Sequence, residues 1–95
     1  MRLCSEKTGF EVRPRKKVRI DLPAVADDVA TAAAVQARVV LPTILVLQNP
    51  DGRAVTVFPD GRMLLRGMPE EEATRLASVL APILYSSENG VSKSA

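Results

Sequence analysis

A chain of 95 residues is long enough for one small domain with a two-layer core and too short for two domains. Its hydrophobic fraction of 46% and charged fraction of 25% are ordinary for a globular protein, and no apolar run reaches the roughly 18 residues that a bilayer span requires. A net charge of +2 does not by itself indicate a nucleic-acid partner, and a single cysteine, Cys4, with no histidine excludes an internal disulfide and makes a zinc site unexpected.

The first nine residues show little periodicity, and we expect them to form a flexible start or an edge segment. No apolar stretch follows the charged N-terminus, so we expect no signal peptide, a cytoplasmic location and no membrane partner. Residues 10–13, FEVR, alternate between apolar and charged side chains. This alternation predicts a first strand, which Pro14 would end.

A basic run, RPRKKVR, follows this strand and places five positive charges within seven positions. The charged residues of this candidate basic patch are Arg13, Arg15, Lys16, Lys17 and Arg19. Two interpretations stay open at this point. The run is either a solvated loop between a strand and a helix, or a patch that binds phosphate or acidic groups.

A first helix is predicted over residues 21–33. Asp21 is suited to the N-cap position, and Pro23 is tolerated in the first turn. Apolar residues at helical spacing mark one face of this helix. They are Leu22, Val25, Ala26 and Val29.

Three antiparallel strands are predicted to follow, at roughly 43–48, 53–58 and 62–66. Turn signals separate them at Asn49-Pro50-Asp51-Gly52 and at Pro59-Asp60-Gly61. In RAVTVFPDGRMLLRG, apolar residues alternate on both sides of Pro-Asp-Gly, which is a specific signal for a β-hairpin. Pro42 predicts a bend or an edge position just before these strands.

A second helix is predicted to begin near Pro69, with three glutamates, residues 70–72, in the first turn, where the helix dipole favours negative charge. Pro82 should kink this helix or end its regular part. The polar residues 86–95 are expected to form a disordered tail. Residues 10–85 would then form a single domain.

The predicted fold class is therefore α+β, in the order β-α-β-β-β-α, with an antiparallel sheet and both helices packed on one face. Strand alternation directs Leu45, Leu47, Val55, Val57, Met63 and Leu65 toward the helices. The opposite face would carry Ile44, Val46, Thr56, Phe58, Leu64 and Arg66, together with Ala54 and Gln48. Such an apolar face is not expected to be left in water, so we expect a second copy, a partner domain or a ligand to cover it.

One resemblance is carried by IDLPAVADDVA, a following strand, AVTVFPDGRMLLRG and a helix start rich in Pro and Glu. This pattern resembles the small C-terminal domain of ThiF/MoeB-type adenylyltransferases, bacterial relatives of ubiquitin-activating enzymes that charge sulfur-carrier proteins. The likeness covers roughly residues 3–84, including Leu3-Cys4 and Val12-x-Pro14, and is sharpest over residues 56–62, TVFPDGR. It implies an accessory domain whose partner is an adenylyltransferase or a sulfur-carrier protein.

The same order is similar to one half of the TATA-box-binding protein, whose open sheet face binds the DNA minor groove with phenylalanine wedges. The matching residues are Ile20-Asp21-Leu22, Phe58, Gly61-Arg62-Met63, Gly67, Glu71-Glu72 and Arg75-Leu76-Ala77. Phe58 matches one wedge, whereas Val40 stands near the position of the other, and Arg66 stands where a small polar residue is expected. Both resemblances imply the same half-saddle fold, and they differ in function.

The function that we favour is a non-enzymatic protein-interaction module that self-associates through the open sheet face. The sequence has no glycine-rich nucleotide loop, no zinc cysteine pairs and no catalytic constellation, so we expect no catalysis, cofactor or metal. The alternative is a DNA-binding half-saddle that acts as a dimer, which relies on the basic run and on Phe58.

Overall fold

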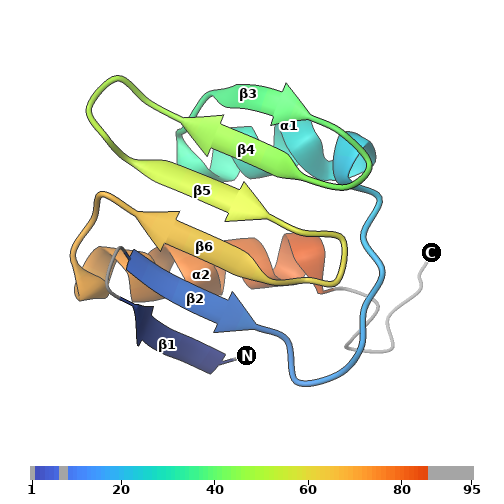
Figure 1. Cartoon of the computed structure of the whole chain (residues 1–95), viewed down its shortest axis with the longest axis horizontal. Coiled ribbons are helices and arrows are strands. Elements are labelled where there is room, and N and C mark those ends of the chain that lie inside the picture. The colour runs from blue at the N-terminus through green and yellow to red at the C-terminus, as the bar shows by residue number, and fades with distance from the viewer. Residues whose placement is uncertain (1, 7–8, 86–95) are drawn as a thin grey trace.

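The computed structural model describes residues 2–6, for which only the backbone is considered, and residues 9–85 (Figure 1). The elements in chain order are β1 (Arg2–Glu6), β2 (Gly9–Arg13), α1 (Leu22–Ala33), β3 (Ala37–Val40), β4 (Leu45–Gln48), β5 (Ala54–Val57), β6 (Met63–Arg66) and α2 (Glu70–Leu84). The predicted α+β class is confirmed. The tail predicted at 86–95 lies outside the described residues.

The strands form one sheet in the order β1-β2-β6-β5-β4-β3, and all neighbouring strands are antiparallel. After β2 the chain passes through α1 to the far edge at β3 and then returns, strand by strand, until β6 pairs with β2. Both helices lie on the same face of the sheet, behind it in Figure 1. The molecule therefore has two layers, and the other face of the sheet is not covered by a described helix.

Two strands extend the predicted order. The first is β1, an edge strand near the N-terminus that pairs with β2. The second is β3. It differs from the central strands because all four of its residues are exposed and its register shifts between Ala37 and Val39. Because β3 buries none of its residues, it lacks the alternation that reveals a strand in the sequence.

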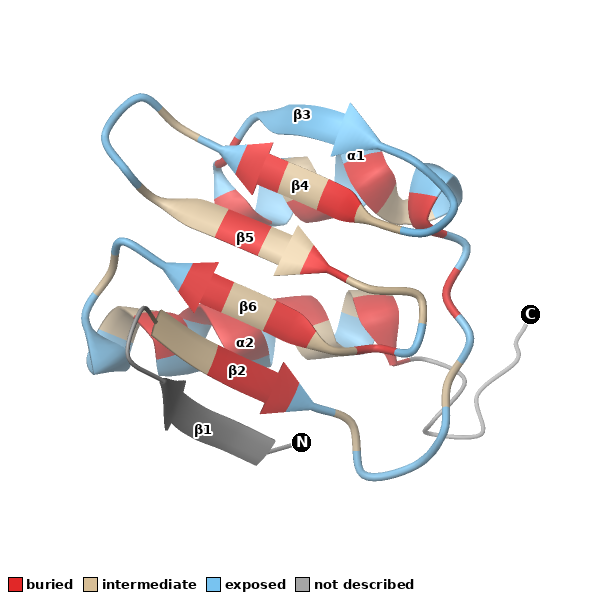
Figure 2. Cartoon of the chain, in the orientation of Figure 1, coloured by how far each residue is buried: buried red, intermediate tan, exposed pale blue. Residues whose placement is uncertain are grey.

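The core lies between the sheet and the helices. The six strand residues predicted to face the helices are fully buried, so the predicted phase of the three central strands is confirmed. Figure 2 shows the resulting alternation of buried and partly exposed positions along β4, β5 and β6. Each buried aliphatic side chain of this kind stabilises the fold by about 1.5–3 kcal/mol relative to an exposed one.

Both helices begin where the sequence predicts, with Asp21 and Pro69 at their N-caps. Asp21 is the N-cap of α1, although its side chain makes no capping hydrogen bond. The second helix continues through Pro82 to Leu84. Pro82 has no N–H to donate to the carbonyl of Ser78, four residues earlier, and the helix ends two residues after it. The Tyr85 N–H donates to the Ala81 carbonyl at 2.7 Å. No described helix is long and apolar enough to cross a membrane.

Asn49, the first residue of the predicted turn before β5, joins this turn to the connection between α1 and β3. Its Nδ2 donates to the Ala34 carbonyl at 2.9 Å, and its Oδ1 accepts a hydrogen bond from the Gln36 N–H at 3.1 Å. Ala34 has a φ of 56°, in the left-handed region that ends the helix. One amide side chain therefore satisfies backbone groups at the point where the chain leaves α1.

We expect Asn49→Ala to lower the free energy of unfolding by about 1–2 kcal/mol, because two hydrogen bonds to backbone groups are lost. Urea denaturation followed by circular dichroism measures this change. Gln36→Ala is the matched control, since it keeps the backbone N–H and should change stability by less than about 0.5 kcal/mol. Equal losses in the two variants would contradict this role of Asn49.

Candidate functional site

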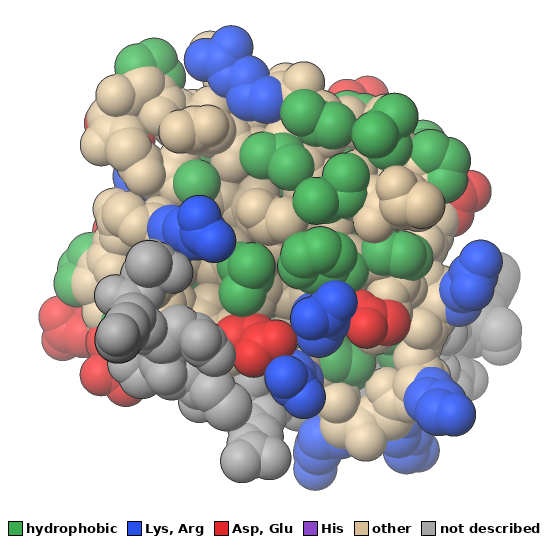
Figure 3. Space-filling view, viewed as in Figure 1, with side chains coloured by type: hydrophobic (Ala, Val, Ile, Leu, Met, Phe, Trp, Pro, Cys, Tyr) green, Lys and Arg blue, Asp and Glu red, His purple; other side chains and the backbone are tan. Residues whose placement is uncertain are grey.

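The open face of the sheet carries the residues that the sequence assigned to it. Ile44, Val46, Thr56, Phe58 and Leu64 are partly exposed there, and Arg66 is exposed at the end of β6. Figure 3, which looks at this face, shows hydrophobic side chains gathered in a band over the sheet. Positively charged side chains border the band around the loop that follows β2.

Cross-strand register joins the middle of this face into one row. Leu64 lies opposite Thr56, Thr56 lies opposite Val46, and Val46 lies opposite Val39 of the edge strand. Directly opposed residues have Cβ atoms about 4.5–5.5 Å apart and pack against one another. The centre of the open face is therefore a continuous uncharged strip, to which Val39 adds a side chain with 39% of its surface exposed.

Phe58 lies on the open face beside this strip and is partly covered by Arg62. The guanidinium carbon of Arg62 is 4.5 Å from the centroid of the Phe58 ring. A cation–π contact at a partly exposed site stabilises by about 0.5–1 kcal/mol. One face of the ring is therefore already occupied within the chain.

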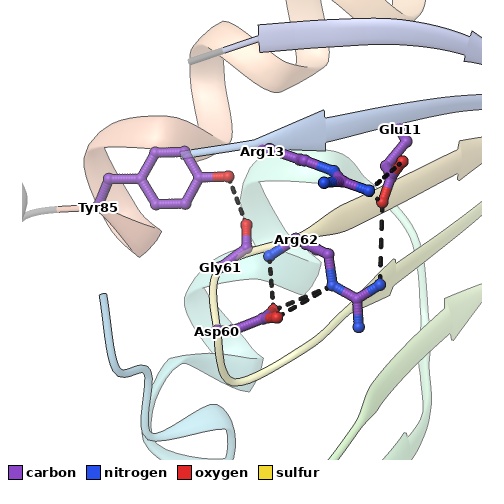
Figure 4. Close-up of polar contacts among 6 residues, drawn as sticks. All are labelled: Glu11, Arg13, Asp60, Gly61, Arg62 and Tyr85. Carbon is purple, nitrogen blue, oxygen red and sulfur yellow. Dashed lines mark hydrogen bonds and ion pairs between the residues drawn. The ribbon is translucent and has the colours of Figure 1, made fainter. Parts of the chain in front are cut away.

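Arg62 also belongs to a polar network with Glu11, Arg13 and Asp60 (Figure 4). Its Nε is 3.1 Å from Asp60 Oδ2, and its Nη1 is 3.9 Å from Glu11 Oε2. Glu11 is only 8% exposed, and its Oε2 also lies 3.3 Å from Arg13 Nε. Two arginines thus neutralise Glu11, the one largely buried acidic residue among those whose burial the structure describes, as a carboxylate in this position requires.

The structure divides the predicted basic patch into two parts. Arg13, Arg15, Lys16 and Lys17 line an open pocket of about 460 Å³, together with Pro14, Val18, Asp60 and Arg62. Arg19 instead lines a second pocket of about 300 Å³, with Ile20, Asp21, Leu22 and Pro42. The basic run follows β2, and the hairpin between β5 and β6 brings Asp60 and Arg62, which the run does not include, to the same pocket.

Within the described part of the chain, no three His, Cys, Asp or Glu side chains come together in a way that could hold a metal ion. The acidic residue closest to the pocket, Asp60, is engaged by Arg62 through both its backbone N–H and its side chain. What these residues offer to a ligand is therefore positive charge and hydrogen-bond donors at the pocket, and apolar surface on the sheet. Comparisons with protein-family models, with curated proteins and with solved structures find no match for this chain.

Proposed function

We propose that the protein is a non-enzymatic interaction module that forms a homodimer through the open face of its sheet. The observation that carries this proposal is the uncharged strip formed by Leu64, Thr56, Val46 and Val39, which no described helix covers. Two sheets pack face to face readily, about 10 Å apart, when both inner faces are apolar.

The size of the face supports a second copy as the occupant. The molecule measures 36 by 24 by 20 Å along its principal axes, and Figure 1 looks down the shortest of these at the sheet. The outline of the whole molecule in this view is at most roughly 900 Å², so a second copy on this face would cover up to about the 800 Å² that each partner contributes to a standard stable interface. A small ligand would cover only a fraction of that area.

The symmetry of the contact also favours a second copy. An isologous dimer places the same patch on both sides of a two-fold axis, which is the commonest arrangement of soluble homo-oligomers. The strip carries no charge that a second strip would repel, and its flanking arginines, Arg62 and Arg66, can remain at a solvated rim. The resemblance to the accessory domain of ThiF/MoeB-type enzymes supports an interaction role as well, and a carrier or adenylating partner would be a further ligand of the dimer.

The DNA-binding half-saddle is the second candidate, favoured by the position of the basic pocket beside the open face. Against it, Arg62 already lies over the ring of Phe58, whereas a wedge side chain must be free to enter a base step. Thr56 is the one side chain of the strip that can donate or accept a hydrogen bond, which is too few to read a series of base edges. The homodimer therefore has the stronger support.

Sedimentation equilibrium tests the dimer with a matched pair of substitutions. We expect the wild type to be dimeric at micromolar concentration and Val46→Glu to weaken the dimer by at least roughly a hundredfold, because the interface would bury an unpaired charge. Val79→Glu makes the same chemical change at an exposed position on α2, away from the open face, and should leave the dimer unchanged. Circular dichroism checks that both variants are folded.

A wild type that is monomeric throughout the micromolar range would overturn the proposed homodimer. Duplex DNA binding measured by fluorescence anisotropy in a salt series tests the second candidate. Binding at moderate salt that is lost in Phe58→Ala would replace the homodimer proposal with the half-saddle.

A further inference from the structure

The pocket beside the open face is formed by two segments that are distant in the sequence. One comprises residues 13–18, at the end of β2 and in the loop that follows it, and the other is the turn between β5 and β6. Figure 4 shows Arg13 above Arg62 and Asp60, with Tyr85 reaching Gly61 from the left. The proposed dimer assigns no ligand to this pocket.

Hydrogen bonds and packing hold the pocket in shape. The loop is attached to the hairpin at both ends, because Val12 pairs with Met63 and the Ile20 N–H donates to the Pro59 carbonyl at 2.9 Å. Between these points the loop lies directly on the turn: a Cβ at Gly61 would be 2.6 Å from a methyl group of Val18. The basic residues between Pro14 and Val18 therefore belong to a short loop that is held to the hairpin at both ends.

Positive charge is concentrated at this pocket. Five cationic residues line it, Arg13, Arg15, Lys16, Lys17 and Arg62, against one acid, Asp60. The lining thus carries a formal excess of four positive charges, whereas the whole chain carries +2, so the rest of the chain carries a net charge of −2. Even when the adjacent Glu11 is included, an excess of three positive charges remains. Such a cluster in a concave site attracts anions strongly.

The chemistry of the lining selects among anions. Arginine forks match phosphate oxygens in a bidentate manner, and lysine adds a mobile point charge. A monocarboxylate would neutralise only one of the excess charges. A volume of about 460 Å³ lies within the range of small-molecule sites and exceeds what one phosphate group fills. We propose that this pocket binds the phosphate groups of a polyanion of at least diphosphate size.

The first test is a titration of the ¹⁵N-labelled full chain with pyrophosphate, followed by NMR, with sodium chloride at matched ionic strength as the reference. We expect saturable shifts of backbone amides in residues 15–19 and 60–62, and weaker shifts with inorganic phosphate. Identical shifts with pyrophosphate and chloride would mean charge screening only and would exclude a free diphosphate as the ligand.

Variants then locate the site. We expect Lys17→Ala to weaken pyrophosphate binding about fivefold and Lys17→Glu to weaken it further, because one charge contact near the surface is lost or reversed. Arg75→Ala removes an exposed arginine from α2, outside the pocket lining, and should change the affinity less than about twofold. Equal effects of Lys17→Ala and Arg75→Ala would show a diffuse response to net charge and would overturn the assigned site.

A parallel titration with a short DNA duplex identifies the source of the phosphate. Saturable binding of pyrophosphate at the pocket supports a free polyphosphate ligand, and binding of the duplex alone, lost in Lys17→Glu, supports a nucleic-acid backbone. Failure of both probes overturns the proposal. Because Lys17 lies outside the uncharged strip, the dimer measured by sedimentation should be unaffected in these variants, so the two proposals fail independently.

Discussion

Gly67→Ala is expected to lower the free energy of unfolding by about 3 kcal/mol, because the added methyl group meets both an unfavourable backbone conformation and a steric overlap. Gly67 follows β6 and has a φ of 74°, a left-handed conformation that costs an L-residue about 1–2 kcal/mol. A Cβ there would also overlap the backbone carbonyl oxygen of Gly52, which cannot move as a side chain could. Steric overlap of this kind adds about 1–3 kcal/mol.

Gly52→Ala separates the cost of the left-handed backbone conformation from the cost of steric overlap. Gly52 has a φ of 97°, also left-handed, but a Cβ added there would meet nothing within 4 Å. This variant should lose only about 1–2 kcal/mol, and urea denaturation of the two variants at one pH gives the difference. Equal losses of stability in the two variants would show that steric overlap with the Gly52 carbonyl oxygen does not destabilise Gly67→Ala.

Tyr85→Ala is expected to cost about 3–5 kcal/mol, as is usual when a buried aromatic side chain is truncated in a core. Tyr85 follows α2, is only 1% exposed, and donates a hydrogen bond from its hydroxyl to the Gly61 carbonyl at 2.5 Å. It therefore attaches the end of the last helix to the hairpin turn beneath the basic pocket. Thermal unfolding should show a fall in Tm of roughly 15–30 °C.

Tyr85→Phe provides the matched comparison, since it keeps the ring and removes only the hydroxyl. We expect it to cost about 1–2 kcal/mol, because a buried hydrogen bond is lost while packing is retained. A loss in Tyr85→Phe as large as that in Tyr85→Ala would mean that the hydrogen bond, rather than the ring, provides most of the stabilisation.

The central strands and both helices could be predicted from the sequence because their signals are local. Alternation in residues 53–66 fixes which side chains face the helices, and Asp21 and Pro69 mark where the helices begin. The edge strands are different. A strand that buries nothing, such as β3, has no periodic pattern to detect, and β1 is recognised by its backbone pairing with β2.

The candidate site was predictable only in part, for a related reason. Residues of the open face follow from the phase of the strands, and the basic run is visible as a run. The contribution of Arg62 to the basic pocket could not be predicted from the sequence, because it depends on how the loop after β2 folds against a later hairpin. Glu11, at an outward position of β2, could have been suspected as a partner for nearby arginines, although its burial depends on Arg13 and Arg62 together.

The irregularity of β3 has a consequence for how copies of the chain can associate. Unpaired backbone groups on an edge strand invite end-to-end growth of sheets into aggregates. This edge is short and interrupted by a register shift, and Arg38 in the shifted segment donates its Nε–H back to the Gln48 carbonyl at 3.3 Å. A bulge and a charged residue at the edge discourage the addition of another strand. The association proposed above, through the sheet face, would close after two copies, whereas association through the edge would propagate as a fibre.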